Sequence, residues 1–398
     1  MKTIRHWFGS LYRVWRREFS LVLRDEGVLI FFLLLPTVYP LVYTLIYNPE
    51  VVHDLPVVIV DDCRTQRSRQ FAAMADATSA IKIVGYASDI EEARRCMNKK
   101  GCYGIMHILA NYDLNINREK QSKVQFYCDM SLLIRYRAFL AALTDLSLAS
   151  DTEIQQQIID TDSSPVANQA VILGNPAEGF ASFVIPGLLI LIIQQSLVLG
   201  ITMLGGGAYE RRRANNGIDP MAVKAPVVAT ILGKSLCYFT IYIPLIVYML
   251  HFVPIIFDLP RVGSMSQWLP MVVPFTFAAI FMGMTLQPLV RQRETSMIVV
   301  VFSSLLFLFL SGITWPRYAM SRLWLAIGDM IPSTWAVNAF TRINSDGATL
   351  QQNMWSLIAL WILCAIYLTT AIILHKKDWG MRKNRASNTP KTKVSCVR

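Results

Sequence analysis

Charged residues are scarce in this sequence. Asp, Glu, Lys and Arg make up 16% of the 398 residues, and hydrophobic residues make up 54%. Soluble globular proteins carry about 25% charged residues, so the composition indicates either one very large core or a chain that has lipid for a solvent. The length of the apolar runs distinguishes the two, because a helix needs about 20 mostly apolar residues to cross a bilayer. Six runs meet this requirement: 28–47, 180–204, 227–252, 268–290, 295–312 and 354–374. The sequence therefore predicts an α-helical membrane protein with six transmembrane helices.

The residue constellations of common enzymes are also missing. The five histidines are scattered, with no HExxH pair, and no two cysteines have the CxxC spacing of a zinc site. A GxSxG nucleophile elbow is absent as well. We therefore predict no catalytic residues, no metal site and no cofactor on this chain.

A phosphate-binding P-loop is suggested only by the triplet Gly233-Lys234-Ser235. The motif also requires a glycine five residues before Gly233, and position 228 is Val. The triplet opens a predicted transmembrane helix instead of following a strand, so Lys234 is expected to snorkel to the membrane surface. ATP hydrolysis, if the protein uses it, is expected on another chain.

The N-terminus lacks the features of a cleaved signal peptide, because its charged lead is long and no small-residue cleavage site follows the apolar run. Residues 1–27 instead predict an amphipathic helix over 4–24. Apolar residues share one face of it at helical spacing: Ile4, Trp7, Phe8, Leu11, Val14, Trp15, Phe19 and Val22. Arginines lie opposite. This pattern favours a helix lying in the membrane interface, and packing against protein is the alternative.

Basic residues are unevenly distributed between the predicted spans. Segments 1–27, 205–226, 291–294 and 375–398 hold six, four, two and eight Lys and Arg residues, twenty in all. The two short segments on the opposite side hold four: Arg261, Arg317, Arg322 and Arg342. Because basic loops stay in the cytoplasm, both termini, including the basic tail 375–398, are predicted to be cytoplasmic. The net charge of +11 is then explained by topology and requires no nucleic-acid partner.

Residues 48–179 are predicted to form an extracytoplasmic α/β domain. Strand-like runs at 57–61, 81–86, 103–108 and 124–127 alternate with helical patterns at 64–77 and 89–99, and a helical return to the membrane covers 131–171. Four cysteines lie in this domain: Cys63, Cys96, Cys102 and Cys128. An oxidising compartment favours disulfides, with Cys63–Cys128 and Cys96–Cys102 the preferred pairing, whereas buried free thiols remain the alternative.

Few polar residues interrupt the predicted spans. Those within them are Gln194, Gln195, Gln287, Ser303 and Ser304. Polar groups in a bilayer usually face the interior of a helix bundle or water. They are candidates for a substrate path, and hydrogen bonding between helices is the alternative.

The stretch 315–342 is predicted to be a re-entrant helical hairpin. Pro316 and Pro332 interrupt it, and Arg322 and Asp329 lie between them. A single spanning helix with those charges would be costly, and proline breaks a helix unless neighbours compensate. Two short helices that enter and leave on one side satisfy both constraints.

Two segments resemble the signatures of ABC-2 type exporter permeases. The first reads Glu210-Arg-Arg-Arg-Ala-Asn-Asn-Gly217, followed by Pro226 and Gly233-Lys234, and is similar to that family's first cytoplasmic loop. The second reads Leu310-Ser-Gly-Ile-Thr-Trp-Pro316, followed by Ile331-Pro332, and is similar to its Ser-Gly-x-x-x-Pro entry to a re-entrant hairpin. Ser311, Gly312, Pro316 and Pro332 carry this second likeness. Ile218 departs from the family, which often has Thr after the glycine.

The α/β region extends the resemblance to nearly the whole chain. Val57–Asp62, Ser68-Arg69 and Glu92-Ala93 resemble the large extracytoplasmic domain of the multidrug-exporter-like subgroup. This likeness implies a multi-pass protein of the bacterial cytoplasmic membrane. It also implies pairing with a second permease chain, as a homo- or heterodimer, association with ATP-binding-cassette ATPase subunits and contact with a periplasmic adaptor protein. The expected cargo is a hydrophobic or amphipathic compound, exported from the cytoplasm or the inner leaflet.

The resemblance further implies that segment 209–226 forms a coupling helix seated in the ATPase. Its expected coupling residues are Glu210, Arg211, Arg212, Arg213, Gly217, Pro226 and Lys234. A membrane-anchored sensor with an extracytoplasmic ligand-binding domain is the competing interpretation. It explains the α/β domain but leaves six spans and the hairpin unexplained. A membrane-embedded enzyme is disfavoured by the missing catalytic residues.

Overall fold

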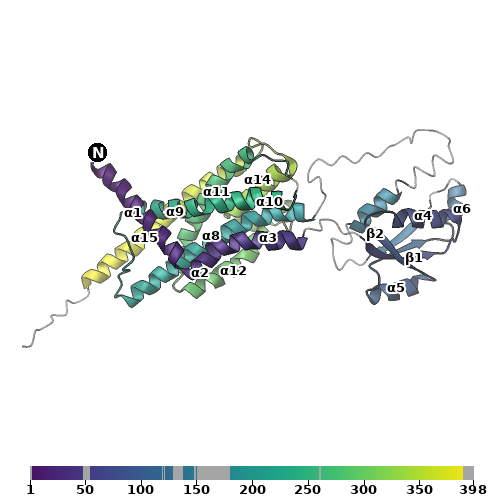
Figure 1. The fold of residues 1–398 in the computed structure, drawn as a ribbon, viewed down its shortest axis with the longest axis horizontal. Helices are drawn as coiled ribbons and strands as arrows, with labels where there is room; N and C mark the ends of the chain where they lie inside the picture. Colours follow the sequence, from purple (N-terminus) through teal and green to yellow (C-terminus); the bar gives the residue numbers. More distant parts are fainter. Residues whose placement is uncertain are drawn as a thin grey trace, which may run out of the picture. The chain divides into compact units, whose positions relative to one another are not determined.

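The computed structural model of the protein describes residues 2–47, 54–118, 120, 122–128, 138–147, 149, 180–259 and 261–388. The chain divides into a helical unit, built from its two ends, and a separate α/β unit built from the region between the first two spans (Figure 1). Each unit is described by itself.

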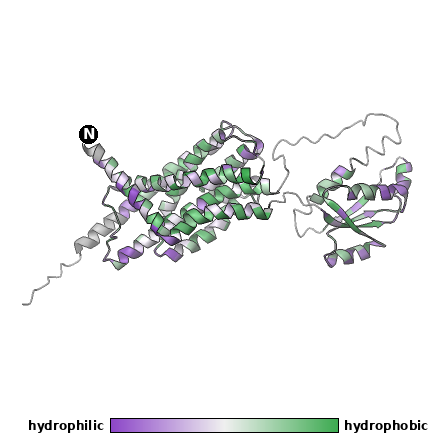
Figure 2. Cartoon of the chain, in the orientation of Figure 1, coloured by the Kyte–Doolittle hydropathy of each residue, from purple (hydrophilic) through white to green (hydrophobic). Residues whose placement is uncertain are grey.

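Within its described residues, the helical unit contains six helices long and apolar enough to cross a membrane, as the sequence predicts. The first consists of α2 (Glu26–Leu29), a π-helical turn (Ile30–Leu34) and α3 (Leu35–Tyr47). The second is α8 (Phe180–Ala214), and the third is α9 (Val227–Val247) with a π-helical turn (Tyr248–Phe252) and α10 (Val253–Ile256). The others are α11 (Met265–Leu286), α12 (Arg293–Leu310) and α15 (Met354–Asn388). A 3-10 turn (Gln287–Leu289) follows α11. Hydrophobic residues run along the spans, and hydrophilic ones gather toward the helix ends (Figure 2).

Two spans are longer than predicted. Helix α8 continues ten residues past position 204, because Ala208–Ala214 contains no proline and is rich in the helix formers Ala, Glu and Arg. Its last turn holds Arg211, Arg212 and Arg213, and cations there interact favourably with the helix dipole. Helix α15 likewise continues to Asn388, two residues before Pro390. The first part of the basic tail is therefore helical.

Helix α8 lies at the centre of the helical unit. In its most apolar window 78% of the residues are buried within the chain, compared with 22% for α12 and α15. Phe32 of the first span is fully buried and packs against Tyr238 and Tyr242 of α9. The outward side chains of α12 include Val301, Phe302 and Leu305, all strongly exposed, as expected for a helix that faces lipid or another chain.

Three further elements complete the helical unit. Helix α1 (Lys2–Arg24) precedes the first span. Between α12 and α15, a 3-10 turn (Arg317–Ala319) is followed by α13 (Arg322–Asp329) and α14 (Pro332–Asp346). The break at Ile331-Pro332 confirms that segment 315–342 is two short helices, since Pro332 occupies the first turn of α14, where a missing N–H is tolerated.

The α/β unit is built around one four-stranded sheet with strand order β2-β1-β3-β4. Its strands are β1 (Leu55–Asp61), β2 (Ile81–Ala87), β3 (Gly104–Ile108) and β4 (Val124–Cys128). Strands β1, β2 and β3 are parallel, and β4 pairs antiparallel with β3. All four strands and the helices α4 (Gln66–Asp76) and α5 (Ile90–Asn98) lie within a few residues of their predicted positions.

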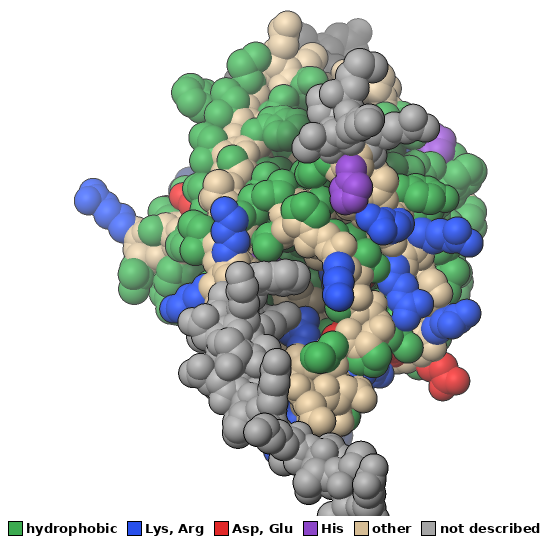
Figure 3. Space-filling model, turned by 90° about the vertical axis from the view of Figure 1, so that its left-hand side faces the viewer, with side chains coloured by type: hydrophobic (Ala, Val, Ile, Leu, Met, Phe, Trp, Pro, Cys, Tyr) green, Lys and Arg blue, Asp and Glu red, His purple; other side chains and the backbone are tan. Residues whose placement is uncertain are grey.

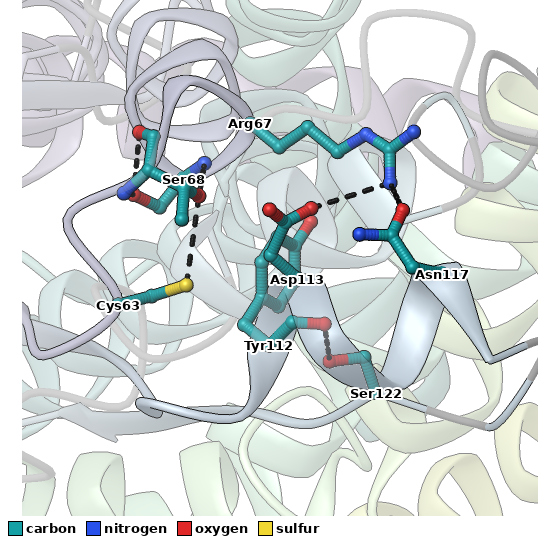
Figure 4. Close-up of polar contacts among 8 residues, drawn as sticks. Cys63, Arg67, Ser68, Tyr112, Asp113, Asn117 and Ser122 are labelled. Carbon is teal, nitrogen blue, oxygen red and sulfur yellow. Dashed lines mark hydrogen bonds and ion pairs between the residues drawn. The ribbon is translucent and has the colours of Figure 1, made fainter.

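The helices of this unit cover both faces of the sheet. The larger core joins Val57 and Ile59 of β1 to Phe71 of α4 and to the helix Ala138–Ser147, and the smaller core joins Val58 and Val60 to α5. Helix α6 (Tyr112–Asn117), which the sequence did not suggest, is held to α4 by Arg67. Arg67 Nη1 lies 3.2 Å from Asp113 Oδ1 and 2.5 Å from Asn117 Oδ1 (Figure 4). The predicted return helix is described only at Ala138–Ser147, and the rest of 131–171 falls almost entirely outside the described residues.

Candidate functional site

Charged side chains from five segments meet at one end of the helical unit. The segments are α1, the last turns of α8, the connection 215–226, the start of α9 and the start of α12. Seen from this end, Lys and Arg side chains spread over the surface and acidic side chains are few (Figure 3). Among the described residues, no group of three or more His, Cys, Asp or Glu side chains is arranged to hold a metal ion. The contacts at this end include ion pairs between its segments.

Glu210 links the end of α8 to the start of α12. Its Oε1 accepts a hydrogen bond from the backbone N–H of Arg293 at 3.0 Å, and its Oε2 lies 3.6 Å from Arg293 Nε. A carboxylate at a helix N-terminus is favoured by the helix dipole and by the unpaired N–H groups there. Glu210 thus binds the start of α12 through both the backbone N–H and the side chain of Arg293.

Arg293 extends this link to the first span. Its Nη2 lies 2.8 Å from Asp25 Oδ2, and its Nη1 lies 3.2 Å from Asp25 Oδ1, which is the strong two-pronged geometry of Arg with a carboxylate. Asp25 also accepts from the N–H of Val28 and caps α2. Glu210, Arg293 and Asp25, which we call the three-span cluster, therefore connect α8, α12 and the α1–α2 junction.

The connection 215–226 contains no helix, which contradicts the expected coupling helix over 209–226. Residues 209–214 belong to α8, and the remainder consists of turns and extended chain. The reason lies in composition: Gly217, Pro220 and Pro226 fall within twelve residues, and each disfavours a continuing helix. Pro226 caps α9, whose first hydrogen bond runs from Thr230 N–H to the Pro226 carbonyl at 2.9 Å.

The connection folds back onto α8. Gly217 has φ of +87°, and its N–H donates to the Arg212 carbonyl at 2.8 Å, which ends the helix in the left-handed conformation that glycine adopts most easily. The side chain of Asp219 is almost buried. Its Oδ1 accepts hydrogen bonds from Arg211 Nε at 3.2 Å and from the backbone N–H of Met221 at 3.0 Å. Arg213 stays exposed.

Helix α1 is packed tightly on α9. Gly233 makes this possible, because a Cβ there would lie 2.9 Å from both the Leu11 carbonyl oxygen and Val14 Cβ. Val14 and Val22 of the predicted apolar face are buried, whereas Phe8 is 59% exposed. Part of the apolar face therefore packs on protein, and the rest remains available to lipid.

A buried carboxylate joins these two helices. Glu18, 4% exposed, lies 2.9 Å from Lys234 Nζ and accepts a hydrogen bond from the hydroxyl of Tyr238. Lys234, which the sequence predicts to snorkel to the membrane surface, has a partner on α1 that accepts a charge-assisted hydrogen bond.

Four residues of this end escaped the sequence analysis: Glu18, Asp25, Tyr238 and Arg293. Glu18 had a detectable signal, because it falls at helical spacing within the apolar face between Val14 and Val22. A single charge inside an apolar stripe indicates a buried partner. Arg293 and Asp25 had no such signal, since both lie at segment ends where charges are usual.

The candidate substrate-path residues do not converge within one chain. Gln194 is buried, and its Oε1 accepts from the Ser333 N–H at 2.7 Å, which ties α8 to the hairpin. Gln287 packs beside Gly205 at the other end of α8 and donates to the Ile201 carbonyl at 3.3 Å. Gln195, near Gln194, keeps both amide atoms buried without a hydrogen-bond partner. Ser303 and Ser304 bond only to carbonyls of their own helix, α12.

The hairpin signature residues shape the turn after α12. Ser311 accepts from the Ile313 N–H, Gly312 has φ of +94°, and Pro316 starts the 3-10 turn. Arg317 then pairs with Asp329 and lies 5.6 Å from the Trp335 ring centroid. The turn is therefore closed on itself by an ion pair between its two arms.

Cys63, Cys96 and Cys102 of the α/β unit are free thiols in this structure. The preferred Cys63–Cys128 pairing is wrong, because β4 is antiparallel. Cys128 lies opposite Gly104 beside Val57, whereas Cys63 follows the other end of β1, six residues or roughly 20 Å away along the strand. Cys96 and Cys102 do lie together. Burial, with a hydrogen bond to Cys96, raises the pKa of Cys102 to about 12.

Among the described residues, six helices are long and apolar enough to cross a membrane, which makes this chain a multi-pass membrane protein. The family model "ABC-2 family transporter protein" matches residues 27–373. The chain therefore belongs to the ABC-2 family of transporter proteins. It is also 20% identical over 380 residues to ABC transporter G family member 20 of Dictyostelium discoideum, with 92% of this chain and 51% of the relative covered. The chain thus spans about half the length of this curated relative.

Proposed function

We propose that this chain is the membrane subunit of an ATP-driven exporter and that its charged end receives the motion of an ATPase. Family membership supports a transport subunit. The ATPase is expected on a separate chain and would dock on the face formed by α1, the end of α8 and the connection 215–226. Two permease chains would pair and move a hydrophobic or amphipathic compound outward. The uneven distribution of basic residues supports placing this end in the cytoplasm of a bacterial cell.

The observation that carries the proposal is the three-span cluster. A force applied to the connection 215–226 acts on the end of α8, because Arg211 binds Asp219 of the connection. Glu210 on the same turn then pulls on Arg293 and, through it, on Asp25. Displacement at one surface segment would therefore move α8, α12 and the first span together, which is the rigid-body rearrangement that an alternating-access exporter requires.

The remaining coupling candidates fit this arrangement in different ways. Arg212 and Arg213 add positive charge beside the connection, Gly217 and Pro226 set its two ends, and Lys234 holds α1. The second permease chain would cover α12, whose exposed apolar side chains lie beside Ser303 and Ser304. Those serines would then face a path shared between two chains. A periplasmic adaptor would meet the α/β unit outside the cell.

The test compares Arg293→Gln with Arg291→Gln in proteoliposomes that contain the ATPase chain co-purifying with this protein. Both variants remove one basic residue at the start of α12, but Arg291 is exposed and lies outside the cluster. We expect Arg293→Gln to reduce both transport and substrate-stimulated ATP hydrolysis about fivefold or more, the lower range of a coupling free energy. Arg291→Gln should behave as the parent. Equal transport by both variants at equal expression would contradict the coupling role, and failure to recover any ATPase chain would contradict the exporter assignment.

A further inference from the structure

A cavity of about 210 Å³ lies between α1, the ends of α8 and α11, the connection 215–226, the start of α9 and α15. It lies on the face where we propose that the ATPase docks, but the coupling role does not require the cavity to hold a ligand. Part of its wall consists of arginines from two segments far apart in sequence, Arg17 of α1 and Arg212 of α8. Arg17 Nε also donates to the Met221 carbonyl at 3.4 Å, so the arginine bridges α1 and the connection at the mouth of this space.

The cavity lining carries excess positive charge. Four cations line it, Arg17, Arg211, Arg212 and Lys234, together with two carboxylates, Glu18 and Asp219. Both carboxylates are almost buried and already engaged, Glu18 by Lys234 and Asp219 by Arg211. Counting Lys, Arg, Asp and Glu alone, the lining has a net charge of +2, which favours a singly or doubly charged anion.

The remainder of the lining is apolar. Val14 and Leu21 of α1, Leu204 of α8 and Val290 after α11 contribute side chains. Val227 and Thr230, from the first turn of α9, place the cavity where a span begins, at the boundary between apolar helix and charged connection. A group that suits both walls has an anionic head and an apolar continuation.

We propose that this cavity binds the phosphate of an anionic phosphate ester, with the headgroup of an anionic phospholipid as the expected occupant. The volume is below the roughly 300 Å³ at which pockets for drug-sized molecules begin, so a headgroup fits and a whole lipid does not. Arginine is well suited to phosphate, because its planar fork donates two parallel hydrogen bonds. Bound phosphate would fasten α1 to α8 and to the connection 215–226, and the lipid composition of the membrane would then set the rigidity of this end.

The variant pair for the test is Arg17→Gln/Arg212→Gln against Arg16→Gln/Arg213→Gln. Each double variant removes one charge from α1 and one from α8, but Arg16 and Arg213 are exposed and outside the cavity. The full-length chain is placed in nanodiscs of phosphatidylcholine alone or mixed with phosphatidylglycerol, and bound lipid is counted by native mass spectrometry. In a second experiment with a soluble phosphate ester, glycerol 3-phosphate is titrated into the phosphatidylcholine nanodiscs, and its binding is followed by phosphorus NMR.

We expect the parent and Arg16→Gln/Arg213→Gln to retain phosphatidylglycerol. Arg17→Gln/Arg212→Gln should retain it at least about tenfold more weakly, because charge-assisted hydrogen bonds to the phosphate are lost. Arg17→Lys/Arg212→Lys, which keeps the charge, should recover part of the retention, as expected if the loss comes from the missing charge. Binding of glycerol 3-phosphate with the same variant pattern and no lipid retention would support the phosphate site and assign a soluble occupant. Equal behaviour of the two glutamine pairs, or no binding in either arm, would overturn the proposal. No ATPase or nucleotide is present, so the result is independent of the coupling role.

Discussion

Single residues at the charged end act as pairs whose members depend on each other. Glu18 is the clearest case, because its carboxylate is almost fully buried between α1 and α9 and has both Lys234 and Tyr238 as partners. A buried ion pair contributes little net stability compared with an apolar pair, but removal of one partner leaves an uncompensated charge. Lys234 is therefore important because its loss would leave the Glu18 carboxylate buried without its cation.

Lys234→Met is expected to destabilise the packing of α1 by about 3–5 kcal/mol, since the Glu18 carboxylate would stay buried without its cation. The double variant Glu18→Gln/Lys234→Met should regain much of the loss. Lys224→Met, at an exposed position of the connection, serves as the control. Thermal unfolding in detergent and protease cleavage within α1 provide the measurements, and equal stability of Lys234→Met and Lys224→Met would show that the pair is dispensable.

Cys96 and Cys102 form the second residue-scale pair. Because the pKa of the Cys102 thiol is raised to about 12 by burial and by its hydrogen bond to Cys96, this thiol stays protonated at neutral pH. Thiolate is the reactive form, so alkylation of Cys102 in the folded protein should be slow at pH 7 and faster as the pH rises toward 12. Peptide mass spectrometry after timed iodoacetamide treatment would show this. We also expect an oxidant to link Cys96 to Cys102, and recovery of a Cys63–Cys128 peptide instead would contradict the sheet register.

At the scale of elements, the connection 215–226 decides how α8 and α9 are joined. A continuous coupling helix would be stiff along its own axis, whereas the observed chain is held to the end of α8 by specific contacts, Gly217 with Arg212 and Asp219 with Arg211. A connection of this kind transmits force through those contacts. Its response to substitution should therefore depend on backbone conformation more than on side-chain volume.

Gly217→Pro and Gly217→Asn separate these effects. Proline cannot adopt the φ of +87° and lacks the N–H that donates to Arg212, while asparagine tolerates the left-handed conformation better than most residues. We expect normal membrane insertion of both, a loss of transport for Gly217→Pro and near-parent transport for Gly217→Asn. Transport at the parent level in Gly217→Pro would mean that the connection is only a linker.

At the scale of the whole molecule, an α/β unit is inserted between the first two of six spans. The segments that hold twenty basic residues join or flank the spans at one end, and the two short segments at the opposite end hold four. The orientation that follows is a prediction of the charge distribution. It has a direct consequence for which surfaces a reagent reaches in an intact cell.

Single cysteines at Glu91 and Asn384, in a background without native cysteines, test this orientation. Glu91 is an exposed residue of α5, and position 384 lies in the last turns of α15. A membrane-impermeant maleimide should label Glu91→Cys in intact cells and Asn384→Cys only after the cells are opened. Labelling of both from outside would reverse the proposed topology.

The sequence by itself determined the elements: six spans, the α/β strands, the hairpin break at Pro332 and the start of α9 after Pro226. These features follow from run length, periodicity and the backbone limits of glycine and proline, which act within a few residues. Only the tertiary structure decided which side chains pair with each other. Glu210 meets Arg293 across 83 positions, and Glu18 meets Lys234 across 216. The antiparallel direction of β4, which separates Cys63 from Cys128, likewise depends on how distant segments pack. Such pairings are set by burial and geometry over the whole fold, and no local pattern in the chain encodes them.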